Sequence, residues 1–266
     1  MTSSEYETFA LRYATRDGDT ASNTYYRYEL YGEPDRTHSV DYFFWVARND
    51  DRTILFDCGY TPARAVSRGR TLVASPEDLL TRIGSSLAEV DHVVLSHMHW
   101  DHIGNVDLFP NATFSLTRRE FEFWTGPFAH RPCIGLALGD EELGGVKALE
   151  RAGRLYQIEE DHRELFPGFR VVTTPGHTPG QLIADVSTAR GSSVVLASDA
   201  LHFTEEMTLD RPFHVFTEIE GMYRGYELLR SLSARPDTVV VPGHDPGVSA
   251  SYEEVAENCF DLTTPR

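Results

Sequence analysis

The sequence predicts an α/β fold, and three observations support this prediction. Short runs rich in β-branched residues, at 93–95, 171–173, 194–196 and 239–241, have the composition of buried strands. Helix-start signals lie between such runs, so strands and helices alternate along the chain. Each run ends in a small or Gly/Pro-containing turn that carries a histidine or an aspartate. With 266 residues and 41% apolar content, the chain is long enough to form one domain, 1–266, around a full core.

The remaining elements follow in chain order. Residues 25–31, 40–47 and 53–56 are predicted to be strands. A helix is expected to begin at Ser75, because this capping residue is followed by proline and by acidic residues that favour the positive end of a helix dipole. Two pairs with capping-box spacing predict further helices. These pairs are Thr117 with Glu120, which would start a helix toward Trp124, and Ser251 with Glu254, which would start a helix toward Phe260.

Residues 121–166 are the least regular part of the chain. Aromatic and aliphatic residues in its first half are interrupted by two proline-containing turns, at 126–127 and 131–132. This segment lies between the main histidine cluster and His177, so it could form a pocket-covering insertion that supplies one wall. The sequence leaves open an alternative in which it covers core or forms a subunit contact, as in a homodimer.

The stretch 96–102 is the most informative part of the sequence. It places three imidazoles and one carboxylate within six positions, directly after the predicted strand 93–95. These side chains belong to His97, His99, Asp101 and His102. His97 and His99 alternate along an extended segment and therefore point the same way, while the other two follow around a turn. Because neutral imidazole and carboxylate suit zinc and related cations, this stretch predicts a metal site.

Three other strand ends carry the same kind of residue. His177 follows strand 171–173, Asp199 follows strand 194–196, and His244 follows strand 239–241. A glycine precedes His177 and His244, where it permits close backbone approach. Each residue alone is a weak signal, since histidines in turns and aspartates at strand ends are common. Together, four strand ends supply five histidines and two aspartates.

This pattern resembles the motif of the metallo-β-lactamase superfamily in its complete two-metal form. It consists of His97-x-His99-x-Asp101-His102, followed by His177, Asp199 and His244. The resemblance extends from residues 54–59, which look like the family's early Asp-x-Gly turn, to residues 242–245. Residues 101–105 and 175–180 are most similar to the N-acyl homoserine lactonase branch. The resemblance implies an αββα sandwich, two facing sheets with helices outside, which periodicity alone would not show.

The resemblance also implies a role for each ligand. One ion would be held by His97, His99 and His177, and the other by Asp101, His102 and His244. Asp199 would bridge them and leave room for a shared hydroxide that attacks the substrate carbonyl. Asp101, beside the attack site, would also act as a catalytic residue that carries a proton to the leaving alkoxide. Two zinc ions are the first expectation, with iron, manganese or cobalt as alternatives.

One position departs from the lactonase pattern. Homoserine lactonases carry a tyrosine three positions after the bridging aspartate, and here His202 stands in that place. An imidazole could donate a hydrogen bond to the carbonyl or leaving oxygen, so His202 is a second candidate catalytic residue. Two alternatives stay open: His202 is structural and the substrate differs, or Tyr223 supplies the hydroxyl from elsewhere in the chain.

Composition limits the partners. A net charge of −17, from 41 acidic and 24 basic residues, argues against nucleic acid, whose binding draws on Lys and Arg. A small neutral or weakly charged substrate is expected instead. Three arginines nevertheless lie close together and could form a local basic patch; they are Arg64, Arg68 and Arg70.

A cytoplasmic protein without a membrane partner is expected. No apolar run approaches membrane-spanning length, and the first residues lack a basic region followed by an apolar one. The cysteines at 58, 133 and 259 are odd in number and far apart, which favours free thiols in a reducing compartment.

The function expected from these observations is that of a metal-dependent hydrolase. Its expected reaction is the opening of a small lactone, such as an N-acyl homoserine lactone, as in quorum quenching. The alternatives are another hydrolase of the superfamily, acting on a thioester, phosphodiester or β-lactam, and a non-hydrolytic di-iron or mono-iron redox protein.

Overall fold

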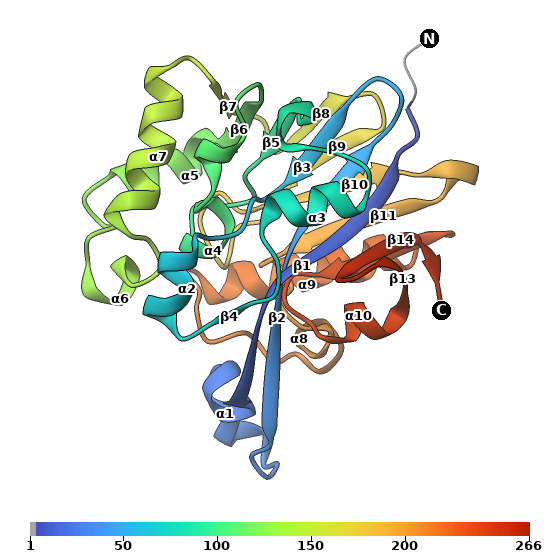
Figure 1. The fold of residues 1–266 in the computed structure, drawn as a ribbon. Coiled ribbons are helices and arrows are strands. Elements are labelled where there is room, and N and C mark those ends of the chain that lie inside the picture. Colours follow the sequence, from blue (N-terminus) through green and yellow to red (C-terminus); the bar gives the residue numbers. More distant parts are fainter. Residues whose placement is uncertain (1–3) are drawn as a thin grey trace.

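The computed structural model describes residues 4–266, apart from the side chains at 190 and 265. The chain forms four layers in the order helix, sheet, sheet, helix (Figure 1). The larger sheet has the order β13-β14-β1-β2-β3-β5-β6-β7, with β4 paired to β1. Its strands are β1 (Glu7–Thr20), β2 (Thr37–Arg48), β3 (Thr53–Phe56), β4 (Thr71–Leu72), β5 (His92–Val94), β6 (Thr113–Thr117), β7 (Leu155–Ile158), β13 (Tyr252–Ala256) and β14 (Cys259–Pro265). The smaller sheet has the order β12-β11-β10-β9-β8. Its strands are β8 (His162–Phe166), β9 (Phe169–Thr173), β10 (Leu182–Ser187), β11 (Ser193–Ser198) and β12 (Thr238–Pro242).

Helices cover the outer face of each sheet. The larger sheet is covered by α2 (Pro62–Arg68), α3 (Pro76–Arg82), α5 (Arg118–Thr125) and α7 (Asp140–Arg151), and the smaller sheet by α9 (Ile219–Ser233). Shorter helices lie in the connections: α1 (Ala21–Thr24), α4 (Trp100–Ile103), α6 (Pro132–Gly135), α8 (Thr204–Leu209) and α10 (Gly247–Ser251). No helix within residues 4–266 is long and apolar enough to cross a membrane.

The apolar runs of the sequence form strands because both faces of each sheet are buried. Successive side chains on a strand point to opposite faces, so Val93 packs under the helices while Val94 packs between the sheets. In the other sheet, Val195 faces α9 and Leu196 faces the opposite sheet. The αββα sandwich expected from the resemblance is confirmed.

The capping signals at Ser75 and Thr117 are confirmed as helix starts. Ser75 Oγ accepts a hydrogen bond from the Asp78 amide, and the Asp78 carboxylate accepts one from the Ser75 amide, completing a capping box for α3. Thr117 Oγ1 accepts from the Glu120 amide at 3.1 Å and starts α5. The Glu120 carboxylate, however, turns inward toward other partners.

Two predicted elements are wrong. Residues 25–31 form one isolated bridge at Tyr25 and a short 3-10 helix, Tyr28–Tyr31, because Arg27 adopts a left-handed conformation with a φ of 53°. The segment after Ser251 forms the hairpin β13–β14 instead of a helix, since β14 pairs with β1 at the sheet edge. Pairing with distant strands overrides the local helix signal there.

Candidate metal centre

The turns after four strands bring the seven predicted ligand residues together. The turn after β5 carries His97 and His99 and leads into α4, while β9, β11 and β12 end before His177, Asp199 and His244. All seven side chains are largely or fully buried. Two groups form, within each of which the candidate ligand atoms lie within 4.8 Å of one another. The first group is His97, His99, His177 and Asp199, and the second is Asp101, His102 and His244.

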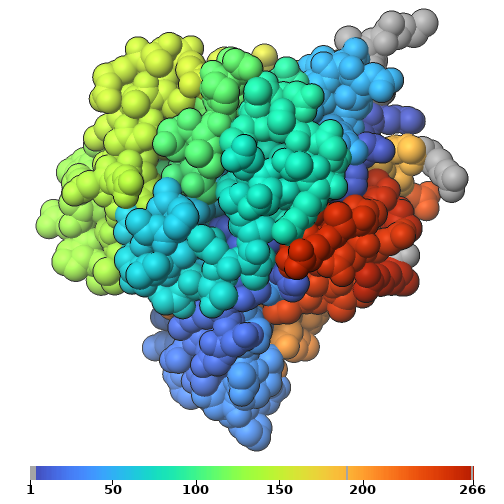
Figure 2. Space-filling view, in the orientation of Figure 1, coloured from blue at the N-terminus to red at the C-terminus, as the bar shows by residue number. Residues whose placement is uncertain are grey.

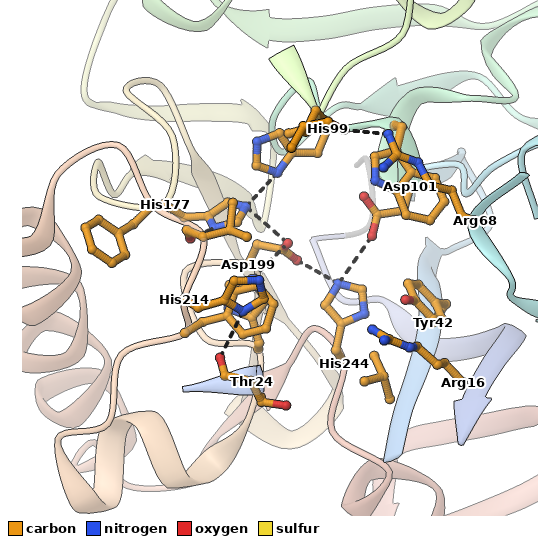
Figure 3. Close-up of a pocket in the computed structure, with 18 of the residues that line it drawn as sticks. Arg16, Thr24, Tyr42, Arg68, His99, Asp101, His177, Asp199, His214 and His244 are labelled. Carbon is orange, nitrogen blue, oxygen red and sulfur yellow. Dashed lines mark hydrogen bonds and ion pairs between the residues drawn. The ribbon is translucent and has the colours of Figure 1, made fainter. Parts of the chain in front are cut away.

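The carboxylate of Asp199 belongs to the first group and also faces the second, between His177 and His244 (Figure 3). Its Oδ2 atom is 3.2 Å from His177 Nε2 and 3.7 Å from His97 Nε2. Its Oδ1 atom is 3.2 Å from His102 Nε2 and 3.0 Å from His244 Nε2. One carboxylate therefore presents a separate oxygen to each set of imidazoles.

Hydrogen bonds on the far side of the rings fix their orientation. Four of the imidazoles use Nδ1 for this contact, at 2.8 to 2.9 Å. The partners are Ser96 Oγ for His97, Asp57 Oδ2 for His102, the Val215 carbonyl for His177 and the Asp41 carbonyl for His244. This leaves each Nε2 directed toward Asp199, as in metal sites whose histidines are oriented by outer partners.

The residues of this cluster fit a divalent cation. The contacts of His97 Nε2, His102 Nε2 and Asp199 Oδ1 lack hydrogen-bond geometry, so these buried atoms have no hydrogen-bond partner among residues 4–266, and the same holds for both ring nitrogens of His202. Buried polar atoms without partners are costly, and a cation bound between them would offset that cost. The donor set, imidazole nitrogen with carboxylate oxygen, is one that zinc, iron and manganese accept.

The electrostatics favour the ligand forms of His97, His99 and Asp199. Burial and the adjacent imidazoles hold the pKa of His97 and that of His99 well below the ordinary value, so both rings are neutral. Burial alone would raise the pKa of Asp199, but the imidazoles around it, led by His102, hold this pKa well below its usual range. Neutral imidazole and ionised carboxylate are the forms that bind metal ions.

Comparison with known proteins agrees with this geometry. The sequence profile of the metallo-beta-lactamase superfamily matches residues 40–244. This chain belongs to the metallo-beta-lactamase superfamily. Membership together with the His/Asp cluster indicates a site for divalent metal.

Individual relatives come from the lactonase branch. The chain is 29% identical to the N-acyl homoserine lactonase AttM of Rhizobium radiobacter, over 68% of this chain and 67% of AttM. It is 27% identical to the N-acyl homoserine lactonase AiiA of Bacillus thuringiensis subsp. kurstaki, over 63% of this chain and 61% of AiiA. The fold is also that of AidC, a dizinc quorum-quenching lactonase solved with N-hexanoyl-L-homoserine. That structure matches with a TM-score of 0.74 and 20% identity, over 92% of this chain and 90% of AidC.

In this superfamily member, Asp57 organises one side of the centre. Asp57 follows β3 in a left-handed conformation, with a φ of 65°. Its carboxylate accepts from the Ser96 amide at 2.7 Å, from Ser96 Oγ at 2.8 Å and from Ser198 Oγ at 2.9 Å. It also contacts His102 Nδ1 at 2.8 Å. The sequence marked this turn only as part of the family pattern and gave Asp57 no role.

Glu120 is a second organising residue that sequence reasoning missed. Its buried carboxylate accepts from the Met98 amide at 3.0 Å, from the Gly180 amide at 2.8 Å and from Trp124 Nε1 at 2.5 Å. It thus joins the loop of His97 and His99 to the loop of His177. The only sequence signal was its distance from Thr117, which explains the helix start and not this contact.

His202 lies against the bridging position. Its Nε2 atom is 3.1 Å from Asp199 Oδ2, and its Nδ1 atom is 3.2 Å from Glu206 Oε1. Its ring stacks on Phe213 with centroids 3.8 Å apart. Burial lowers the pKa of this imidazole, but the two carboxylates outweigh burial and raise the pKa to about 9. Tyr223, the other candidate, is 39% exposed on α9 and is not among the described residues that line the cavity.

A cavity of about 560 Å³ opens above the cluster. Asp101, Asp199, His202 and His244 line its floor. The segment 121–166 contributes wall residues, namely Trp124, Cys133, Ile134, Leu136 and Ala137. Three arginines from other segments also line the cavity, Arg16, Arg68 and Arg70, together with Asp19. The cavity is thus apolar on one side and cationic on another.

The position of Asp57 generates a testable prediction. Asp57→Asn should lower metal affinity by about 10- to 100-fold, because the amide cannot accept all the hydrogen bonds that orient His102. Competition titration with a chromophoric chelator would measure this change. Asp107→Asn, at an exposed aspartate, is the matched control and should bind metal like the unaltered protein. Equal affinity in both variants would contradict the orienting role of Asp57.

Proposed function

We propose that this protein is a metal-dependent hydrolase that opens a small lactone ring, of which an N-acyl homoserine lactone is the leading example. The observation that carries this proposal is Asp199, whose two oxygens face separate sets of imidazoles at the floor of a cavity. The likeness to AttM and AiiA supports the lactone as the substrate class.

In this proposal the cluster holds two ions, with zinc as the first choice and iron, manganese or cobalt as alternatives. His97, His99 and His177 would hold one ion, Asp101, His102 and His244 the other, and Asp199 would bind both. Bound ions of this kind lower the pKa of water and polarise a carbonyl, so hydrolysis needs no serine or cysteine nucleophile.

Two side chains of the chain are proposed to act on the substrate. His202 would donate a hydrogen bond from Nε2 to the carbonyl or leaving oxygen, while Glu206 holds the opposite ring nitrogen. Asp101, beside His102 and His244 at the cavity floor, would hold the proton and pass it to the leaving alkoxide. The segment 121–166 would supply the apolar wall for the rest of the substrate.

The proposal also covers the domain organisation, the cellular compartment and the partners of the protein. We propose that the chain works as a single domain in the cytoplasm, without a nucleic-acid partner, in line with its net charge of −17 and its separate free cysteines. A homodimer is compatible with the proposed chemistry, because all the proposed ligands come from one chain.

A substrate panel tests the proposed function. The purified, metal-loaded protein should open lactones with a higher kcat/KM than it shows for aryl esters, thioesters, phosphodiesters or β-lactams. Treatment with a chelator should abolish turnover, and added zinc should restore it. Rapid cleavage of thioesters or phosphodiesters without lactone opening would overturn the lactonase proposal. The broader proposal of a metal-dependent hydrolase would still stand.

The bridging role of Asp199 predicts a change in metal content. The unaltered protein should bind about two ions per chain, and Asp199→Ala should bind fewer, because both ions lose a shared anionic ligand. Activity should fall by orders of magnitude while the circular dichroism spectrum is retained. Elemental analysis after metal loading measures the content. A ceiling of one ion in the unaltered protein would refute the two-ion assignment.

His202 predicts an effect on turnover and not on metal content. His202→Ala should lower kcat by about 100-fold, the order expected for a lost hydrogen bond to a developing charge. His202→Tyr should recover part of kcat because it restores the hydroxyl usual in lactonases. Tyr223→Phe is the control and should match the unaltered protein, because Tyr223 does not line the cavity. A normal kcat in His202→Ala would assign His202 a purely structural role.

A further inference from the structure

Two arginines line the cavity without a carboxylate partner. Arg68 and Arg70 lie at and just beyond the end of α2, and neither forms an ion pair with any carboxylate within the described residues. The neighbouring arginines differ. Arg64 is bidentate to Glu142 at 2.6 Å, and Arg16, also in the cavity lining, pairs with Asp19 at 2.5 Å.

Both guanidinium groups are held in place. Arg68 donates to the Leu136 carbonyl at 2.5 Å, and Arg70 donates through Nε to Tyr42 Oη at 2.6 Å. Arg70 Nη1 also donates to the Arg68 carbonyl at 2.6 Å. Their guanidinium carbons lie 5.2 and 5.9 Å from the centroid of the same Trp100 ring, a distance typical of cation–π contact. Figure 2 shows α2 (cyan) packed against the segment of α6 and α7 (green), which fixes the backbone that carries the pair.

The pair lies on one side of the metal centre. Figure 3 shows Arg68 beside Asp101, with Tyr42 between that region and Arg16. No ion pair joins Arg68 to the Asp101 carboxylate, whose oxygens lie 3.8 Å from His102 and 3.9 Å from His244. His202 contacts Asp199 from another direction and stacks on Phe213. A substrate in the cavity would therefore meet cations near Asp101 and an aromatic surface near His202.

An anion would complete this arrangement. Two like charges over one indole repel each other, and both guanidinium groups are only partly exposed. Each group retains N–H donors beyond the contacts it makes, because a guanidinium carries several donors in a fixed fork. An oxyanion between them would accept charge-assisted hydrogen bonds and relieve the repulsion.

We propose that Arg68 and Arg70 bind an oxyanionic group carried by the substrate, so that the lactone opened by this protein is an acidic one. The inference rests on the proposed function and specifies its substrate class. It replaces the expectation of a neutral or weakly charged substrate, which came from the net charge of −17. Net charge sets the long-range field, whereas selectivity in a cavity depends on the groups that contact the ligand.

Matched lactones test the inference. The probes are homoserine lactones with succinyl, glutaryl or adipoyl chains, each ending either in a free carboxylate or in the corresponding carboxamide. The three lengths vary how far the anion reaches from the ring, while each pair differs only in charge. The metal-loaded proteins are the unaltered chain, the double variant Arg68→Gln/Arg70→Gln and the control Arg224→Gln, which removes an exposed arginine on α9.

The expected result is a preference for the carboxylate lactones over the carboxamide lactones, and this preference should depend on Arg68 and Arg70. For at least one length, kcat/KM should be about tenfold or more higher for the carboxylate than for the carboxamide. The double variant should lose this preference, so that its kcat/KM values for carboxylate and carboxamide become equal, while its metal content matches that of the unaltered chain. The control should keep the preference, and Arg68→Lys/Arg70→Lys should recover part of it.

Other outcomes separate the two proposals. Two outcomes would overturn the inference but leave the lactonase proposal standing. One is an equal kcat/KM for carboxamide and carboxylate lactones at every length, and the other is a preference that the double variant retains. If none of the lactones is opened, the proposed function is wrong. The six compounds then serve as ligands in calorimetry, where tighter carboxylate binding that the double variant loses supports an anion site, and equal binding overturns it.

Discussion

The position of the Asp199 carboxylate is the constraint on which the rest of the site depends. Each of its two oxygens is approached by one imidazole from each sheet, Oδ2 by His97 and His177 and Oδ1 by His102 and His244, so the sheets must meet at a fixed distance there. The backbone before it is unusual, because Ser198 has a φ of 45° in the left-handed region. Such a conformation in a residue other than glycine costs about 1–3 kcal/mol and persists only where surrounding structure holds it. Gly243 belongs to that structure, since a Cβ there would lie 2.6 Å from the Ser198 carbonyl oxygen.

Three buried carboxylates outside the ligand set hold this geometry. Asp57 fixes the ring of His102, Glu120 joins two ligand loops, and Glu206 holds the ring of His202. Buried carboxylates stabilise a structure only when their oxygens are satisfied, and each of these accepts several hydrogen bonds from separate segments. The centre is therefore specified by long-range contacts that close only in the complete sandwich.

The sequence located the residues of the His/Asp cluster better than the residues that support them, for a physical reason. Ligand residues share a local signature, a histidine or aspartate in the turn after an apolar strand, and this placed His97, His177 and Asp199 correctly in the fold. The partners of Glu120 lie as far away as Gly180, a separation that no local pattern encodes. The same limit explains the missed hairpin at β13–β14, whose residues carry a helix cap but pair with β1. Net charge is limited in a similar way, because an average over the chain does not describe the lining of one cavity.

A histidine at position 202, where a tyrosine is usual in lactonases, has different requirements of its surroundings. A phenol presents one polar atom, whereas an imidazole presents two nitrogens, and a buried ring needs an environment for both. Here Nε2 faces Asp199 and Nδ1 faces Glu206. Glu206 in turn accepts from the Phe203 amide at 2.9 Å and from the Tyr226 hydroxyl at 2.7 Å, so α8 and α9 are connected to the site through one carboxylate. His202 and Glu206 therefore form an ion-pair contact, and a tyrosine at 202 would leave the buried Glu206 with one contact fewer.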